Sequence, residues 1–112
     1  MSTNAAPLRS LTIDQTTAEN GTPVLICRGR FVLETSNAFK TEVKKLSPDH
    51  KLVQADMSGV DYVDSAGLGS LLGIFVSAKS DGCHLELINV HPRVKDLLNM
   101  TRLTSILQAD KG

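Results

Sequence analysis

One serine, Ser65, stands where a hydroxyl group could carry a chemical modification. It follows Asp64 within residues 61–73, which read Asp-Tyr-Val-Asp-Ser-Ala-Gly-Leu-Gly-Ser-Leu-Leu-Gly and lead into an amphipathic run. The start of a helix exposes unpaired backbone N–H groups and the positive end of the helix dipole, so it stabilises negative charge. At such a start, Ser65 is predicted either to cap the helix or to accept a phosphate group that changes what the surface binds.

Three glycines follow Ser65 at positions where a helix favours other residues. Gly67 and Gly69 fall in the predicted first turn, where we expect them to leave backbone amides open and to let another surface approach closely. Gly73 falls in the middle of the predicted helix, at a cost of roughly 1 kcal/mol relative to alanine. This pattern indicates a packing or docking role for the glycines.

Other residues that could do chemistry lack the partners that they would need. The three histidines show no spacing that converges on a metal ion. Asp56, Asp61 and Asp64 form a run of carboxylates, but no nucleophile–base pair accompanies them. The Gly-x-Gly at 67–69 lacks the third glycine and the Lys-Ser/Thr of a phosphate-cradling loop. We therefore expect no catalytic residue, no metal and no cofactor, and a protein that is not an enzyme.

The composition is that of one globular domain without a bias toward a charged partner. The chain has 112 residues, and twelve basic residues balance twelve acidic ones, so no net field attracts nucleic acid or anionic membranes. No apolar run approaches the roughly 18 residues of a membrane span, and the N-terminus lacks the pattern of a signal peptide. We expect a flexible tail over residues 1–7, a domain over residues 8–112, no membrane insertion and a cytoplasmic location.

The first part of the chain predicts a β-hairpin. Leu11 and Ile13 alternate with polar residues, which is typical of an edge strand. Asn20-Gly21 favours a tight turn because both residues tolerate a positive φ angle. The run at 24–27 is apolar on both faces, as in an interior strand.

A helix and a short strand are expected next. The helix is predicted to begin with Thr35 or Ser36 as its cap and to end before Pro48, which cannot continue the backbone ladder. Residues 51–56 then predict a strand. The buried stripe of the helix is expected to be Phe39, Val43 and Leu46.

The second half of the chain predicts two more helices around one strand. The helix at about 66–79 carries apolar residues at helical spacing, expected to be buried: Leu68, Leu71, Leu72, Phe75 and Val76. Residues 84–90 alternate as in a strand, and Pro92 is a favoured first residue of a helix. Residues 106–107 predict a last strand or helical turn. The stripe of the third helix is expected to be Val94, Leu97, Leu98 and Thr101.

The order of these elements indicates the α/β class. Strands that are separated by helices are expected to pair in parallel, whereas the first hairpin is antiparallel. We therefore predict a single layered domain with a mixed four- to five-stranded sheet and helices packed on it.

Residues 56–72 closely resemble the phosphorylation-site segment of STAS domains, in particular that of bacterial anti-sigma factor antagonists. The shared core is Asp-Ser-x-Gly-Leu between a strand and a helix, here Asp64-Ser65-Ala66-Gly67-Leu68. The resemblance covers nearly the whole chain, and it includes the early Gly29-Arg30-Phe31 turn and the late strand at 84–90 followed by Pro-Arg-Val. It implies a single STAS-like domain.

The resemblance also implies a phosphorylation switch. In that family the unphosphorylated protein binds an anti-sigma factor that is itself a serine kinase, and so frees a sigma factor. The kinase phosphorylates the serine and breaks the complex, and a phosphatase resets it. Carried over to this sequence, Ser65 is the phospho-acceptor, and Asp64 and Gly67 shape its turn. The expected partner-binding residues are Asp64, Ser65, Ala66, Gly67, Leu68, Phe31 and Val32.

One position departs from the family pattern. After the second strand the family usually carries Gly-x-Leu/Ile-Asp, and that aspartate contributes to partner contact. Here Val32 occupies the aspartate position, and Glu34 follows two residues later. A second function therefore stays open: an accessory STAS subunit of a lipid-transport ATPase complex or of a stress-signalling scaffold, in which Ser65 is a helix cap.

Overall fold

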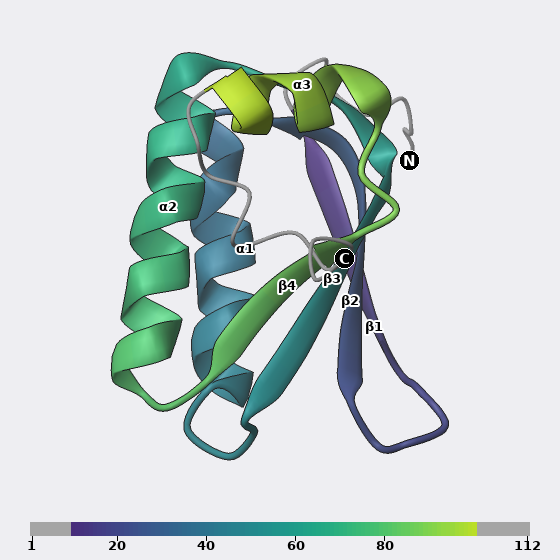
Figure 1. Ribbon diagram of the computed structural model, residues 1–112, viewed down its shortest axis with the longest axis vertical. Helices are drawn as coiled ribbons and strands as arrows, with labels where there is room; N and C mark the ends of the chain where they lie inside the picture. The colour runs from purple at the N-terminus through teal and green to yellow at the C-terminus, as the bar shows by residue number, and fades with distance from the viewer. Residues whose placement is uncertain (1–9, 101–112) are drawn as a thin grey trace, which may run out of the picture.

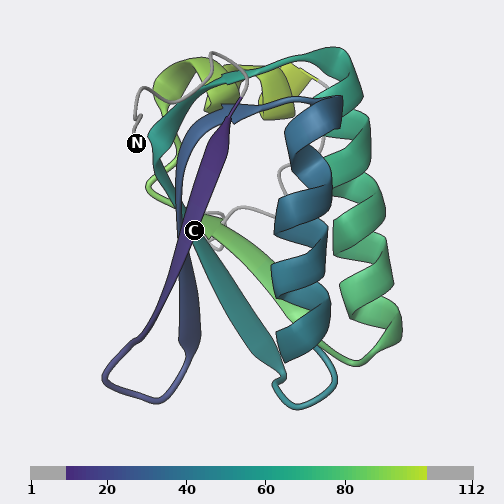
Figure 2. The same ribbon diagram turned by 180° about the vertical axis from the view of Figure 1, so that it is seen from behind.

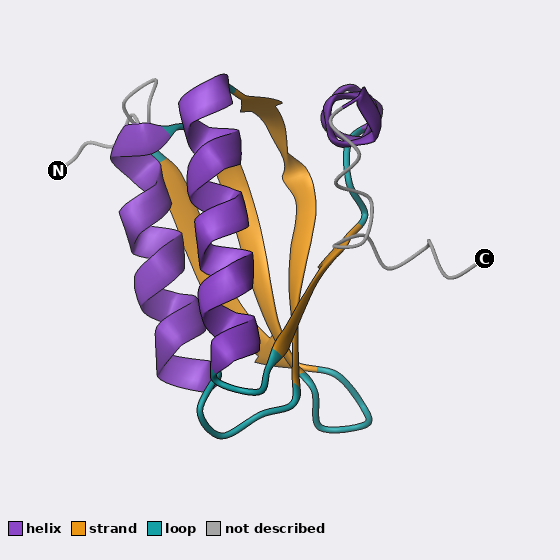
Figure 3. Ribbon diagram, turned by 60° about the vertical axis from the view of Figure 1, so that its left-hand side comes forward, coloured by secondary structure: helices purple, strands orange, loops and turns teal. Residues whose placement is uncertain are grey.

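The computed structural model describes residues 10–100, which form one β-sheet and three helices (Figure 1). The strands follow the spatial order β1-β2-β3-β4. Helices α1 and α2 lie side by side on one face of the sheet, and α3 is set apart from them (Figures 2 and 3). The elements are β1 (Leu11–Thr17), β2 (Pro23–Phe31), α1 (Leu33–Leu46), β3 (Leu52–Val63), α2 (Ser65–Ser80), β4 (His84–Ile88) and α3 (Pro92–Met100).

The sheet is mixed, as the order of the elements predicted. Strands β1 and β2 pair antiparallel around the turn at Gly21, whose φ is 89°. Strand β2 then pairs in parallel with β3, and β3 in parallel with β4, because α1 and α2 carry the chain back across the sheet each time. The prediction of an α/β domain with a hairpin and parallel crossovers is confirmed.

The core lies between the sheet and the two helices. The inward residues of β3 and β4 alternate along their strands, as the pleat requires. In α1, Phe39 and Val43 are fully buried, and the Phe39 ring packs edge-on against Phe31 of β2 at a centroid distance of 5.3 Å. The buried strand residues that face the helices include Leu25, Cys27, Val53, Ala55, Leu85 and Leu87.

Two strands are longer than the sequence predicted. The predicted turn at Gly29-Arg30-Phe31 is wrong, because β2 continues to Phe31 with irregular register on either side of Gly29. Strand β3 continues beyond Asp56 to Val63, because its second half pairs with the extended part of β2. Polar residues and glycine have a low propensity for strands, so the backbone hydrogen bonds of this pairing hold the segment in the strand conformation.

Helix α2 buries a different face from the one predicted. Leu68 and Leu71 are buried as expected, but Leu72 and Phe75 are only half-buried, and Val76 is 61% exposed. Ile74 and Ala78 take their place in the core. The sequence of α2 is apolar on most sides, so its spacing alone did not select one face. Packing of α2 against both α1 and β4 selects the face that is buried.

Helix α3 packs against the end of β3 that extends beyond β4. It begins at Pro92, as predicted, and buries Val94 and Leu98. Strand β4 ends at Ile88 rather than Val90, because Asn89 takes a left-handed conformation with φ of 55°. The predictions for residues 1–7, Thr101 and residues 106–107 lie outside the described residues.

Between residues 10 and 100, the helices are all too short or too polar to cross a lipid bilayer.

Candidate functional site: the start of helix α2

Asp64, not Ser65, caps helix α2. The Asp64 backbone is extended, with φ of −94° and ψ of 176°, and its Oδ1 accepts a hydrogen bond from the Gly67 N–H at 2.7 Å. The Asp64 carbonyl oxygen accepts the Leu68 N–H at 2.8 Å. The alternative in which Ser65 caps the helix is therefore wrong. Aspartate and serine are both good caps, and the place where β3 ends gives this position to Asp64.

Ser65 is the first residue of α2 and is exposed to solvent. Within residues 10–100 its hydroxyl group has no hydrogen-bond partner. Ala66 beside it is exposed as well, and Asp64 is half-buried. The hydroxyl is therefore accessible at a helix start whose capping interaction is already made.

Gly67 lets the start of α2 pack against the end of β2. A Cβ atom at Gly67 would collide with the backbone of Phe31 and would lie 3.0 Å from the Cα of Val32. The Gly67 N–H is occupied by Asp64, so the prediction that this glycine leaves its amide open is wrong. At Gly69, in contrast, a Cβ atom would meet nothing within 4 Å.

The junction between β2 and α1 packs against the first turn of α2. Val32 is the N-cap residue of α1, and its N–H donates to the Thr35 hydroxyl at 3.0 Å. Thr35 in turn donates to the Arg30 carbonyl oxygen at 2.7 Å. Helix α1 thus begins at Leu33, and the prediction that Thr35 or Ser36 is its cap is wrong. Thr35 instead lies inside the first turn and satisfies the backbone before it.

The expected partner-binding residues divide into an exposed and a buried set. Asp64, Ser65 and Ala66 reach the surface, whereas the other four lie in the core: Phe31, Val32, Gly67 and Leu68. Buried side chains position the turn from below and do not offer a contact surface. The Val32 side chain is buried in the protein. The family's aspartate at this position would be expected to reach outward to a partner.

Sequence reasoning missed two exposed apolar residues next to this turn. Leu33, directly after Val32, is 61% exposed, and Tyr62 on β3 is 43% exposed. The Arg30 guanidinium lies 4.7 Å from the centre of the Tyr62 ring. Leu33 directly follows Val32, where the sequence departs from the family pattern, so this departure was the available signal for Leu33.

A groove extends from Leu33 along the outer side of the α1–α2 pair. Its volume is about 400 Å³. Gly73 contributes an open wall, since a Cβ atom there would meet nothing within 4 Å. Side chains from both helices line the groove, among them Leu33, Ser36, Lys40, Ser70 and Ile74.

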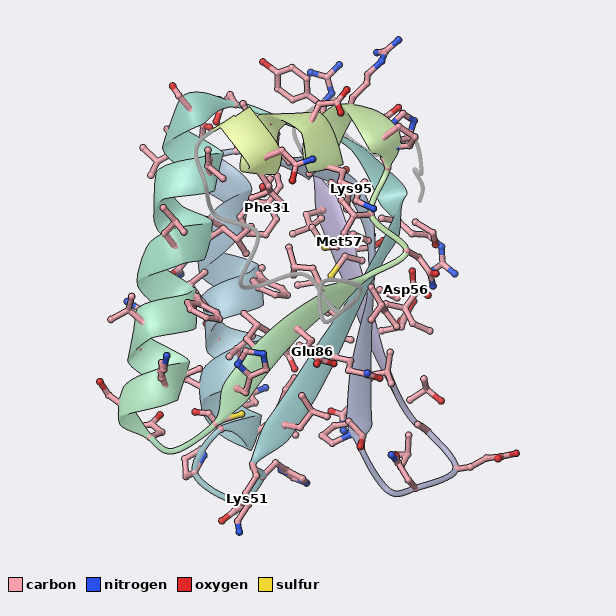
Figure 4. The ribbon with its side chains drawn as sticks, viewed as in Figure 1. Phe31, Lys51, Asp56, Met57, Glu86 and Lys95 are labelled. Carbon is pink, nitrogen blue, oxygen red and sulfur yellow. The ribbon has the colours of Figure 1, made fainter. Side chains whose placement is uncertain are left out.

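Asp56 does not share a site with Asp64 at the start of α2. Asp56 accepts hydrogen bonds from the Ser58 N–H at 2.9 Å and from Asn89 at 3.3 Å. Partial burial raises the pKa of Asp56, but these hydrogen bonds outweigh it and leave the pKa below its ordinary value. Figure 4 shows Asp56 well apart from Phe31, whose backbone packs against Gly67 in the first turn of α2. Asp56 therefore links the middle of β3 to Asn89, just after β4, and does not contribute to the Ser65 turn.

The histidines have local partners. The Nδ1 atom of His50 lies 2.9 Å from the Leu46 carbonyl oxygen, and the His91 Nδ1 accepts the Arg93 N–H at 3.2 Å. The His84 ring packs edge-on against Phe75. Among residues 10–100, no three His, Cys, Asp or Glu side chains are grouped as metal ligands.

Comparisons with known proteins place this geometry in a family. The family model of the STAS domain matches residues 15–111. An anti-sigma factor antagonist from Mycobacterium paratuberculosis superimposes with a TM-score of 0.74 at 19% identity, covering 94% of this chain and 88% of that one. The unphosphorylated form of the anti-sigma factor antagonist SpoIIAA gives a TM-score of 0.69 at 14% identity, with 87% and 86% covered.

The same fold occurs inside a much larger protein. The murine Slc26a9 anion transporter matches with a TM-score of 0.66 at 18% identity, over 87% of this chain but 19% of that one. At these identities the solved structures establish the fold, and the family model extends over most of the sequence. The chain belongs to the STAS domain family.

Proposed function

We propose that this protein is an anti-sigma factor antagonist that acts as a phosphorylation-gated binding switch. With Ser65 unphosphorylated it binds an anti-sigma factor that is a serine kinase, and phosphorylation of Ser65 ends this binding. A phosphatase restores the first state. In this role the protein regulates transcription in the cytoplasm by binding and not by catalysis.

The accessibility of the Ser65 hydroxyl carries this proposal. Asp64 already caps α2, so a kinase can modify Ser65 without breaking a hydrogen bond that holds the helix. The solved antagonists of similar fold support the same assignment by their names.

A phosphate at this position would change the surface and not the fold. Phosphorylation adds about −1.5 to −2 charge at pH 7. At the first residue of a helix this charge meets the positive end of the dipole, so α2 tolerates it. The new charge would lie next to Asp64, where it would repel an acidic partner and would impose a desolvation cost on an apolar one.

The test is phosphorylation and binding with the serine-kinase anti-sigma factors of the source organism, each purified and mixed with ATP. We expect one of them to bind this protein and to phosphorylate Ser65, as mapped by mass spectrometry. Ser65→Ala should bind without being phosphorylated, and Ser65→Asp should bind weakly. Phosphate on another residue, or loss of binding in Ser65→Ala, would overturn the proposal.

The buried Val32 favours a second candidate. Because its side chain replaces the family's aspartate and lies in the core, the surface lacks that acidic contact with a kinase. An accessory STAS subunit of a lipid-transport ATPase complex or of a stress-signalling scaffold would not need it. The neighbouring genes distinguish the two functions: a serine-kinase gene supports the switch, and genes for transporter subunits support the accessory subunit.

A further inference from the structure

The groove between α1 and α2 begins next to the β2–α1 junction, against which the first turn of α2 packs. The first turn of α2 contacts Val32, and the next residue, Leu33, forms the rim of the groove. Ser70, five residues after Ser65 on the same helix, lines the opposite wall. Ser65 itself does not line the groove, so a partner that covers Ser65 reaches the groove by extending past Leu33.

The groove has an exposed apolar residue at one end and a buried one further along. Leu33 is 61% exposed, and the buried Ile74 lies about two helical turns along the groove, level with Lys40. Gly73 keeps the wall open, because any side chain there would project into free space. Contacts within the described residues do not explain this mid-helix glycine, which is less favourable than alanine in a helix.

The groove also has a cation, Lys40, that forms no ion pair with the residues that the structure describes. It is the charged residue among those that line the groove. Its neighbours on α1 differ, since Lys44 pairs with Asp81 and Lys45 with Glu42. Seven residues of helix separate Leu33 from Lys40, which corresponds to about 10 Å or two helical turns.

We infer that this groove binds an amphipathic helix of the anti-sigma factor, an inference that rests on the proposed function. An apolar side chain of that helix packs against Leu33, and an acidic side chain about two turns along pairs with Lys40. Leu33 and Lys40 lie about two turns apart on one face of α1, a spacing that side chains at i and i+7 of a partner helix match. A phosphate on Ser65, near the Leu33 end of the groove, then repels the acidic helix, which gives the switch its direction.

Two substitutions at Gly73 test the groove directly. Gly73→Phe places a ring in the groove, whereas Gly73→Ala leaves it open, and both replace glycine by a residue that favours the helix more. Binding is measured by calorimetry against the serine-kinase anti-sigma factor that binds the wild type. We expect Gly73→Phe to weaken binding by about tenfold or more and Gly73→Ala by less than about twofold, with thermal unfolding confirming that both are folded.

Charge reversal provides a second, independent measurement. Lys40→Glu should weaken binding by about tenfold, while Lys95→Glu, on the exposed side of α3, should change it by less than about twofold. The groove proposal is wrong, and the switch still stands, if the wild type binds and Ser65→Asp weakens binding but Gly73→Phe and Lys40→Glu both bind like the wild type. Failure of the wild type to bind any of these kinases would overturn both.

Discussion

The carboxylate of Asp64 accepts the backbone N–H of Gly67 at 2.7 Å, and the Ser65 hydroxyl between the two residues has no hydrogen-bond partner among residues 10–100. One residue holds the helix start and its neighbour presents the hydroxyl. The division of roles means that the stability of α2 and the chemistry of Ser65 can be varied separately.

Replacing Asp64 should destabilise the protein, whereas replacing Ser65 should not. Asp64→Ala removes the cap and is expected to lower the free energy of unfolding by about 1 kcal/mol. Asp64→Asn keeps an accepting oxygen and should retain most of the stability. Ser65→Ala should change it by less than about 0.5 kcal/mol. Urea denaturation measures all three, and an equal loss in Ser65→Ala would show that Ser65 caps the helix after all.

The two glycines of the first turn should respond in opposite directions to alanine. Gly67→Ala pushes a Cβ atom into the backbone of Phe31 and should destabilise by about 1–3 kcal/mol. Gly69→Ala meets open space on the same helix and should stabilise by up to about 1 kcal/mol. Thermal or urea unfolding of the matched pair checks this. A stabilising Gly67→Ala would contradict the close approach of α2 to the end of β2.

Alkaline pH should destabilise the protein through Cys27. Burial, and then the nearby charge of Asp56, raise the pKa of the Cys27 thiol to about 12. In the unfolded chain the thiol ionises near its ordinary value of 9.0, so the unfolded state gains stability first. The contribution is complete below pH 9 and is lost progressively as the pH rises toward 12. Between pH 8 and about pH 11, the free energy of unfolding measured from unfolding curves should fall less steeply with pH for Cys27→Ala than for the wild type.

Acid should weaken the link between the ends of α1 and α2. Hydrogen bonds from Lys44 at 2.8 Å and from Ser47 at 2.7 Å lower the pKa of Asp81 below its ordinary 3.8. A carboxyl group of this kind stabilises the fold above its ordinary pKa, and the contribution disappears as the pH falls through the lowered value. Asp81→Asn should therefore show a shallower loss of stability below about pH 4 in circular dichroism titrations. If Asp81→Asn lost stability below about pH 4 as steeply as the wild type, the Lys44–Asp81 ion pair would not form in solution.

Several features of the fold could be predicted because they depend on neighbours in the sequence. Asn20-Gly21 tolerates the positive φ of a tight turn, and Pro92 has the φ of a first helical residue. The alternation at 84–88 places Leu85 and Leu87 on the buried face of β4. These signals are local, so the order of strands and helices followed from the sequence.

Other features depend on what packs against each element. The polar second half of β3 is a strand because β2 pairs with it, and β2 itself extends to Phe31 for the same reason. The buried face of α2 includes Ile74 and not Val76, because α1 and β4 both contact this apolar helix. No periodicity within one segment contains that information.

For the candidate site, the sequence by itself determined that Ser65 lies at the junction of a strand and a helix in a STAS domain. The tertiary structure decided its chemistry. The pairing that carries β3 to Val63 makes Asp64 the cap and leaves the Ser65 hydroxyl accessible. The packing of α2 on the end of β2 requires glycine at 67 and brings Leu33 beside the switch, because residues far apart in the chain meet only when the core is formed.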